Sequence, residues 1–215
     1  MQDSPGHKSI SIVEPNKFIK SAFEFLLQNE SWIKLSGSFI SIEEFANSDS
    51  SAVTDILICD LKDIASDEFL TVRSLRIQFP SMTIAAATTT NYDGLIIRAI
   101  INGVSGYVSK TTSGKEFLNA LKFIASGYSP VTPQLAGGIS DFIKKSRLYS
   151  NLDSCFLLYE EETLLAKFAE GKSFSTIAEE LGTTVGTIGK EIRNLYNKVF
   201  KIAELKRSAN ISFKN

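Results

Sequence analysis

Hydrophobic positions in the first half of the chain form short apolar runs that alternate with stretches of helical periodicity. Each run has five to eight residues, a usual strand length, and residues 55–60 are apolar almost throughout, as buried parallel strands are. The predicted strands are residues 9–13, 32–39, 55–60, 82–88 and 106–110, and the predicted helices lie at about 18–26, 41–46, 66–78, 91–103 and 113–126. Five strand–helix units predict an α/β fold, a flavodoxin-like five-stranded parallel sheet with helices on both faces.

The pattern changes after Gly127, where YSPVTPQLAGGI contains two prolines and two glycines. We expect a linker over residues 128–150, with a short helix in QLAGGISDFIKK, and a flexible tail over residues 1–7. The predicted domains are therefore 8–127 and 151–215. The second has no strand pattern and is predicted to be all-α. Four helices are predicted in it. The first begins at Leu157 and Leu158 and runs to about residue 171, and the others lie over 173–181, 185–200 and roughly 202–212.

Residues 175–199 have the spacing of a helix-turn-helix. Ala178 is small where two helices approach closely, Gly182 suits a left-handed turn, and Ile188 places an apolar side chain against the first helix. Thr184 is expected to cap the following helix through its hydroxyl. An inward stripe is predicted for that helix at Ile188, Ile192, Leu195 and Val199.

Local charge favours nucleic acid as the partner of this helix, although the whole chain has a net charge of only −1. Residues 183–215 contain seven lysines and arginines against two glutamates, whereas residues 151–182 contain seven acids against two lysines. The predicted groove contacts are Lys190, Arg193 and Asn194, and the predicted phosphate contacts are Thr184, Thr187 and Lys198. The alternative is a helical bundle that uses the same turn for packing alone. It is favoured by Gly186 and Gly189 inside the helix and by the acid Glu191.

Composition excludes several other classes. The only histidine is His7, in the tail, which removes most histidine-dependent catalysis and metal binding, and no phosphate-binding loop is present, so we expect no enzyme. No apolar run is long enough for a membrane span, and the N-terminus has no apolar signal core. Cys59 and Cys155 have no paired spacing and are expected to be reduced thiols in a cytoplasmic protein.

The C-terminal residues resemble the LuxR/NarL-type DNA-binding domain, with Gly171, Ile177-Ala178, Leu181 and Thr187-Ile188 matching its pattern. That family usually has a basic residue where this chain has Gly189, and often a histidine where it has Glu191. Residues 8–127 resemble the receiver domain of the same response regulators. The resemblance places Asp60 at the phosphoacceptor position, Thr88 at the hydroxyl position, Lys110 at the phosphate-contacting lysine and Tyr107 at the switch aromatic.

The receiver pocket departs from the family pattern at its acids. The family has two adjacent acids after the first strand, whereas this chain has Glu14-Pro15, and Lys62 adds a positive charge near Asp60. One interpretation is a regulatory and dimerising receiver that works without phosphorylation and needs no cofactor. A second is ordinary phosphorylation by a histidine kinase, with Glu14 and Asp60 holding Mg²⁺. In a third, Asp60 simply pairs with Lys110 or Lys62.

These features together predict a transcription regulator that binds double-stranded DNA as a homodimer, because one recognition helix reads only a few base pairs. The alternative is a protein-interaction module that forms a heterodimer with another regulator and has no DNA affinity of its own.

Overall fold

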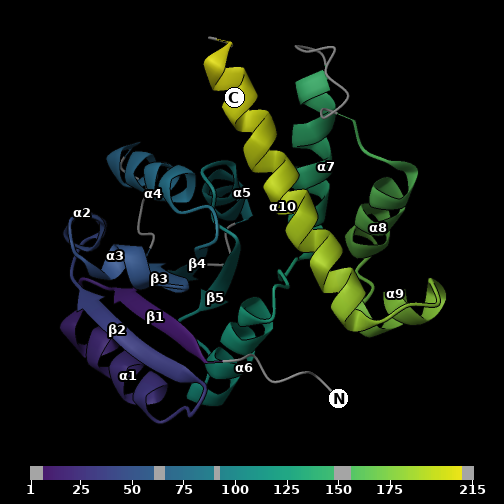
Figure 1. The fold of residues 1–215 in the computed structure, drawn as a ribbon. Helices are drawn as coiled ribbons and strands as arrows, with labels where there is room; N and C mark the ends of the chain where they lie inside the picture. The colour runs from purple at the N-terminus through teal and green to yellow at the C-terminus, as the bar shows by residue number, and fades with distance from the viewer. Residues whose placement is uncertain (1–6, 61–65, 90–92, 148–155, 210–215) are drawn as a thin grey trace. The chain divides into compact units, whose positions relative to one another are not determined.

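The computed structural model describes residues 7–60, 66–89, 93–147 and 156–209 (Figure 1). The chain divides into two compact units. The receiver-like unit comprises Met1–Asn91 and Gly103–Gly127, and the helical unit comprises Tyr92–Asn102 and Tyr128–Asn215. Each unit is described by itself below.

The receiver-like unit is built on a fully parallel five-stranded sheet, which confirms the predicted fold class. Its strands pair in the order β2-β1-β3-β4-β5, the order of flavodoxin-like doubly wound sheets. The strands are β1 (Lys8–Val13), β2 (Ile33–Phe39), β3 (Ile56–Asp60), β4 (Thr83–Thr88) and β5 (Gly106–Ser109). The first four residues of β3 are buried and only Asp60, at its carboxyl end, is partly exposed, so this strand is apolar up to its last residue.

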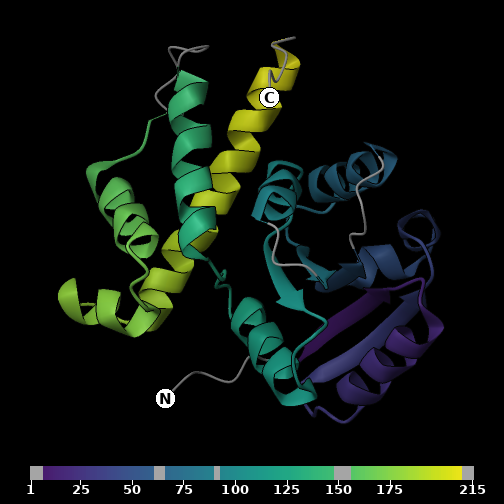
Figure 2. The same cartoon turned by 180° about the vertical axis from the view of Figure 1, so that it is seen from behind.

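Three helices of this unit, α1, α2 and α6, begin at side-chain caps. Asn16 caps α1, Ser41 caps α2, and Ser113 forms a capping box with Glu116 at the start of α6. The helices are α1 (Lys17–Gln28), α2 (Ile42–Ala46), α3 (Ser50–Val53), α4 (Ser66–Gln78) and α6 (Gly114–Ala125). Helices α1 and α6 cover one face of the sheet, and α2, α3 and α4 lie on the other (Figures 1 and 2).

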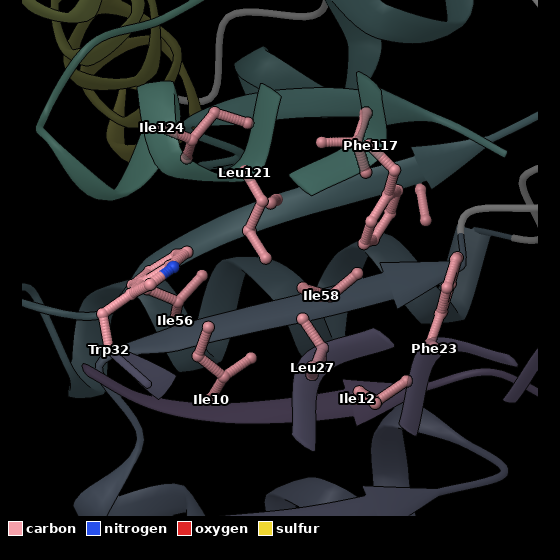
Figure 3. Close-up of a cluster of buried hydrophobic side chains, with 13 residues drawn as sticks. Ile10, Ile12, Phe23, Leu27, Trp32, Ile56, Ile58, Phe117, Leu121 and Ile124 are labelled. Carbon is pink, nitrogen blue, oxygen red and sulfur yellow. The ribbon is translucent and has the colours of Figure 1, made fainter. Parts of the chain in front are cut away.

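A dense core lies between the sheet and helices α1 and α6 (Figure 3). Phe23 of α1 stacks on Phe117 of α6 with ring centroids 4.6 Å apart, and Trp32 is buried at the edge of the cluster. Isoleucines from β1 and β3 point into it between the two helices. Cys59 is fully buried on β3, and burial, followed by the charge of Asp60, raises the pKa of its thiol to about 12. This thiol is therefore a packing group.

The helical unit has fewer helix breaks than the sequence pattern predicts. Its helices are α5 (Asp93–Ile101), α7 (Pro133–Arg147), α8 (Tyr159–Ala169), α9 (Phe174–Glu180) and α10 (Val185–Ser208). The two predicted helices at 185–200 and 202–212 are one continuous helix, α10, so the predicted break near residue 201 is wrong. No glycine or proline occurs between Gly189 and Ser208, and the buried stripe continues through Ile202 and Ala203.

Helix α7 contributes strongly to the core of the helical unit. It lies in the segment expected as a linker, yet Leu135, Ala136, Ile139 and Ile143 are all buried. It packs against α5, α8 and α10. Within the described ranges, no helix combines the length and the hydropathy that a membrane crossing requires.

Candidate functional site

The carboxyl edge of the sheet brings Glu14, Asp60 and Lys110 together from three separate strands. Glu14 directly follows β1, Asp60 ends β3 and Lys110 directly follows β5. The Lys110 ammonium lies 2.6 Å from Asp60 Oδ1 and donates a hydrogen bond to Glu14 Oε2. All three side chains are at most 4% exposed. One buried cation therefore bridges two buried carboxylates.

Backbone contacts hold Glu14 in this position. Its Oε1 accepts a hydrogen bond from the Asn16 amide at 2.9 Å, and its own amide donates to the Phe39 carbonyl at 3.0 Å. Both carboxylate oxygens of Glu14 are thus engaged, one by a backbone amide and one by an ammonium. Pro15, the next residue, is exposed and has no ionisable group.

A small pocket of about 100 Å³ opens beside Asp60. Most of its lining is apolar, from Val13, Pro15, Ile40 and Ile42, with Ser41 and the two acids Asp60 and Glu68. Glu68 was not identified from the sequence, and its position in the first turn of a predicted helix after Asp60 is the signal that could have found it.

The remaining predicted receiver residues are placed as follows. Thr88 is buried at the end of β4, beside the strand that Asp60 ends, and Tyr107 is partly buried in β5. Lys62 lies outside the described residues. Its contribution to the pocket stays a prediction.

The described side chains around Asp60 do not form a shell suited to Mg²⁺. That ion needs near-octahedral oxygen ligands, usually several carboxylates and waters. Among the described residues no group of three histidine, cysteine or acidic side chains is close enough to hold a metal. The ammonium of Lys110 is already bound to both carboxylates that the sequence offers as ligands.

The helical unit has the predicted helix-turn-helix geometry. Ala178 of α9 and Ile188 of α10 are buried, and Gly182 between them has a φ of +62°. The Thr184 hydroxyl accepts from the Thr187 amide at 3.1 Å, so Thr184 caps α10 as predicted. Lys167 and Lys172 bind Glu180, and these hydrogen bonds lower the pKa of its carboxyl group. They tie α9 to α8 and its C-terminal turn.

The six residues predicted to contact DNA divide into two groups. Thr184, Thr187, Lys190 and Asn194 are exposed. Arg193 is partly buried, and its Nη2 donates to the Tyr128 carbonyl at 2.8 Å. Lys198 lies 2.5 Å from Glu161 of α8 and donates to the Phe156 carbonyl at 2.9 Å. The sequence pattern did not predict these intramolecular contacts of Arg193 and Lys198.

Comparison with known proteins finds response regulators over nearly the whole chain, although no family model matches it. Response regulator protein VraR of Staphylococcus aureus is 23% identical over 191 residues, which cover 88% of this chain and 89% of VraR. A structure of the RcsB–DNA complex has a TM-score of 0.52 at 20% identity and covers 96% of this chain and 100% of that chain. A LuxR-family response regulator from Aurantimonas sp. SI85-9A1 has a TM-score of 0.54 at 19% identity over 63% of this chain and 97% of that chain. The fold is therefore that of a receiver domain followed by a C-terminal helical domain.

Proposed function

We propose that this chain is a response regulator of the NarL/LuxR type that binds double-stranded DNA through α10 and regulates transcription. The observation that carries the proposal is the exposed face of α10, which presents Thr187, Lys190 and Asn194 directly after a helix-turn-helix turn. A helix in this position can enter the major groove with its N-terminal residues at the base edges. The similarity to RcsB, a relative solved in complex with DNA, supports the same use here.

The side chains have different proposed roles. Lys190, Arg193 and Asn194 carry groups that can reach base edges, because lysine and arginine pair with guanine and asparagine pairs with adenine. Thr184 and Thr187, at the first turn of α10, are suited to phosphate oxygens. Lys198 can contact a phosphate only by exchanging its ion pair with Glu161.

A homodimer is the proposed binding form. One recognition helix covers only a few base pairs, so two copies on half-sites about one helical turn apart give sufficient specificity. RcsB has been solved as dimers bound to DNA. The function is tested by repeated selection of duplexes from a random pool with the full chain. A recurring pair of half-sites at this spacing is expected, and a pool with no enriched sequence would contradict the proposal.

The receiver-like unit is proposed to regulate DNA binding without phosphorylation. Phosphoryl transfer to an aspartate needs cations that neutralise the charge spread over the phosphoryl oxygens, and Mg²⁺ normally supplies most of that charge. Here Lys110 binds both Glu14 and Asp60, and Pro15 provides no second acid beside Glu14. This arrangement supports a structural role for the three charged side chains, instead of a role as a phosphorylation site.

Beryllofluoride with Mg²⁺, a mimic of the phosphoryl group, is expected not to bind the native chain. Calorimetric titration should show no saturable heat at millimolar concentrations, because Lys110 engages the carboxylates that would hold the metal. The matched variant is Pro15→Asp, which restores an acid next to Glu14 at an exposed position. Saturable micromolar binding by the unmodified chain would overturn phosphorylation independence. It would leave DNA binding by α10 untouched.

A further inference from the structure

Three consecutive residues, Tyr128, Ser129 and Pro130, lie along one side of α10. The Ser129 amide donates to the Gly189 carbonyl at 3.2 Å, and the Tyr128 carbonyl accepts from Arg193 Nη2 at 2.8 Å. The Pro130 carbonyl accepts from the Tyr196 hydroxyl at 2.5 Å. Both Ser129 and Tyr196 are almost completely buried. We call residues 128–130 the strap.

The strap contacts residues that lie along a single stripe of α10, and a glycine in that stripe leaves space for it. Gly186, Gly189, Arg193 and Tyr196 are spaced by three, four and three residues, which places them on one side of a helix. A Cβ atom at Gly186 would lie 2.8 Å from the Tyr128 hydroxyl oxygen and 3.2 Å from Cζ of the same ring. Gly189 is buried, and its carbonyl accepts from Ser129.

These contacts explain two glycines that the helix would otherwise disfavour. Glycine is a poor helix former, and two of them within the first turns of a proposed recognition helix weaken it. At Gly186 the missing side chain leaves room for the Tyr128 ring, and Gly189 contacts the strap through its carbonyl, which accepts from the Ser129 amide. The same stripe contains Arg193, whose guanidinium is bound by the strap.

The strap lies on the flank of α10 next to the exposed face of Thr187, Lys190 and Asn194, and it binds Arg193, one of the proposed base contacts. The major groove is about 12 Å wide and admits one helix, whose own diameter with side chains is already about 10–12 Å. A helix with an additional peptide along its side is too wide to enter fully. Arg193 also cannot reach a base edge while its Nη2 donates to Tyr128.

We infer that the strap restrains DNA binding, and that α10 enters the groove only after residues 128–130 leave the Gly186–Tyr196 stripe. This inference rests on the proposed function, since it concerns the access of DNA to the same helix. The strap directly follows Gly127, the last residue of the receiver-like unit. A conformational change in that unit can therefore be transmitted to the strap through the backbone that joins them.

The test combines two variants with a matched control. Gly186→Leu places a side chain where Tyr128 lies, and Tyr128→Gly removes the ring without changing α10. Gly137→Leu is the control, because it also replaces a helical glycine but nothing lies within 4 Å of its Cβ position. Duplex affinity is measured by fluorescence anisotropy. Release of the strap is measured independently as hydrogen exchange at the Ser129 amide.

Both strap variants are expected to bind random-sequence duplex about tenfold more tightly than the unmodified chain and to lose protection at Ser129. Affinity rises because a smaller fraction of the protein is then in the strapped state, which does not bind the duplex. The control should change neither. Adding duplex to the unmodified chain should also expose the Ser129 amide.

Two results would overturn the inference and are distinguishable. If duplex binds the unmodified chain while Ser129 stays protected, the strap does not restrain binding, although the proposed function stands. If the strap variants lose Ser129 protection and neither they nor the unmodified chain bind duplex at low salt, the inference fails together with the proposed function.

Discussion

Replacing Lys110 with methionine is expected to lower the free energy of unfolding of the receiver-like unit by about 3–5 kcal/mol. The substitution keeps an unbranched apolar side chain but removes the ammonium that bridges Glu14 and Asp60. Glu14 is fully buried, so its carboxylate would be left without the cation that compensates its charge. The loss is large because an unpaired buried charge costs more than the pair itself contributes.

The only tryptophan of the chain allows this loss to be measured in the relevant unit. Trp32 belongs to the core of the receiver-like unit, so its fluorescence during urea unfolding reports on that unit. Lys115→Met, at an exposed position of α6, is the matched control and should change stability little. Adding Glu14→Gln and Asp60→Asn to Lys110→Met should recover part of the loss. A loss below about 1 kcal/mol would show that the cluster is not an essential part of the fold.

Replacing Lys190 and Arg193 together with alanine is expected to reduce affinity for the selected DNA site at least a hundredfold. Each bidentate contact to a base edge contributes about 1–3 kcal/mol of discrimination, and a dimer loses each contact twice. Lys190 is exposed, and Arg193 becomes available once the strap leaves it. Gel-shift titration measures the effect, and circular dichroism checks that the helices persist.

The control for this pair is Lys17→Ala with Lys20→Ala, which removes two positive charges from α1 in the receiver-like unit. It separates a local loss from a general change in net charge. Equal affinity of the Lys190/Arg193 variant and the unmodified chain would remove this face of α10 from the interface. Arg193→Ala alone has two opposed effects on DNA affinity. It removes a base contact, which lowers the affinity, and it removes a hydrogen bond that holds the strap, which raises the affinity.

Local patterns were sufficient to predict the sheet and most helix ends. An apolar run such as residues 55–60 forms a buried parallel strand because both of its faces are covered, and residues such as Ser41 and Thr184 cap helices through contacts within four residues. The break expected near residue 201 was wrong because the sequence there has neither a glycine nor a proline, so one apolar stripe continues past it.

The long-range contacts of the candidate sites could not be predicted from local patterns. Lys110 and Glu14 are 96 residues apart, Lys198 and Glu161 are 37 apart, and Arg193 and Tyr128 are 65 apart. Spacing and periodicity describe neighbours on one element and do not report which distant polar groups meet. Both Gly186 and Gly189 are unfavourable in a helix, and both contact the segment expected to be a linker. A Cβ at Gly186 would meet the Tyr128 ring, and the Gly189 carbonyl accepts from Ser129.

The most direct test of DNA binding through α10 is the salt dependence of affinity for a random-sequence duplex, measured by anisotropy for the full chain. A protein that places basic side chains on phosphates displaces counterions, so the logarithm of the association constant should fall linearly as the logarithm of the salt concentration rises. The account predicts this steep decline, with weaker binding by the Lys190/Arg193 variant at every salt concentration. Absence of binding at low salt, for the unmodified chain and the strap variants alike, would contradict it and favour a module that acts only through other proteins.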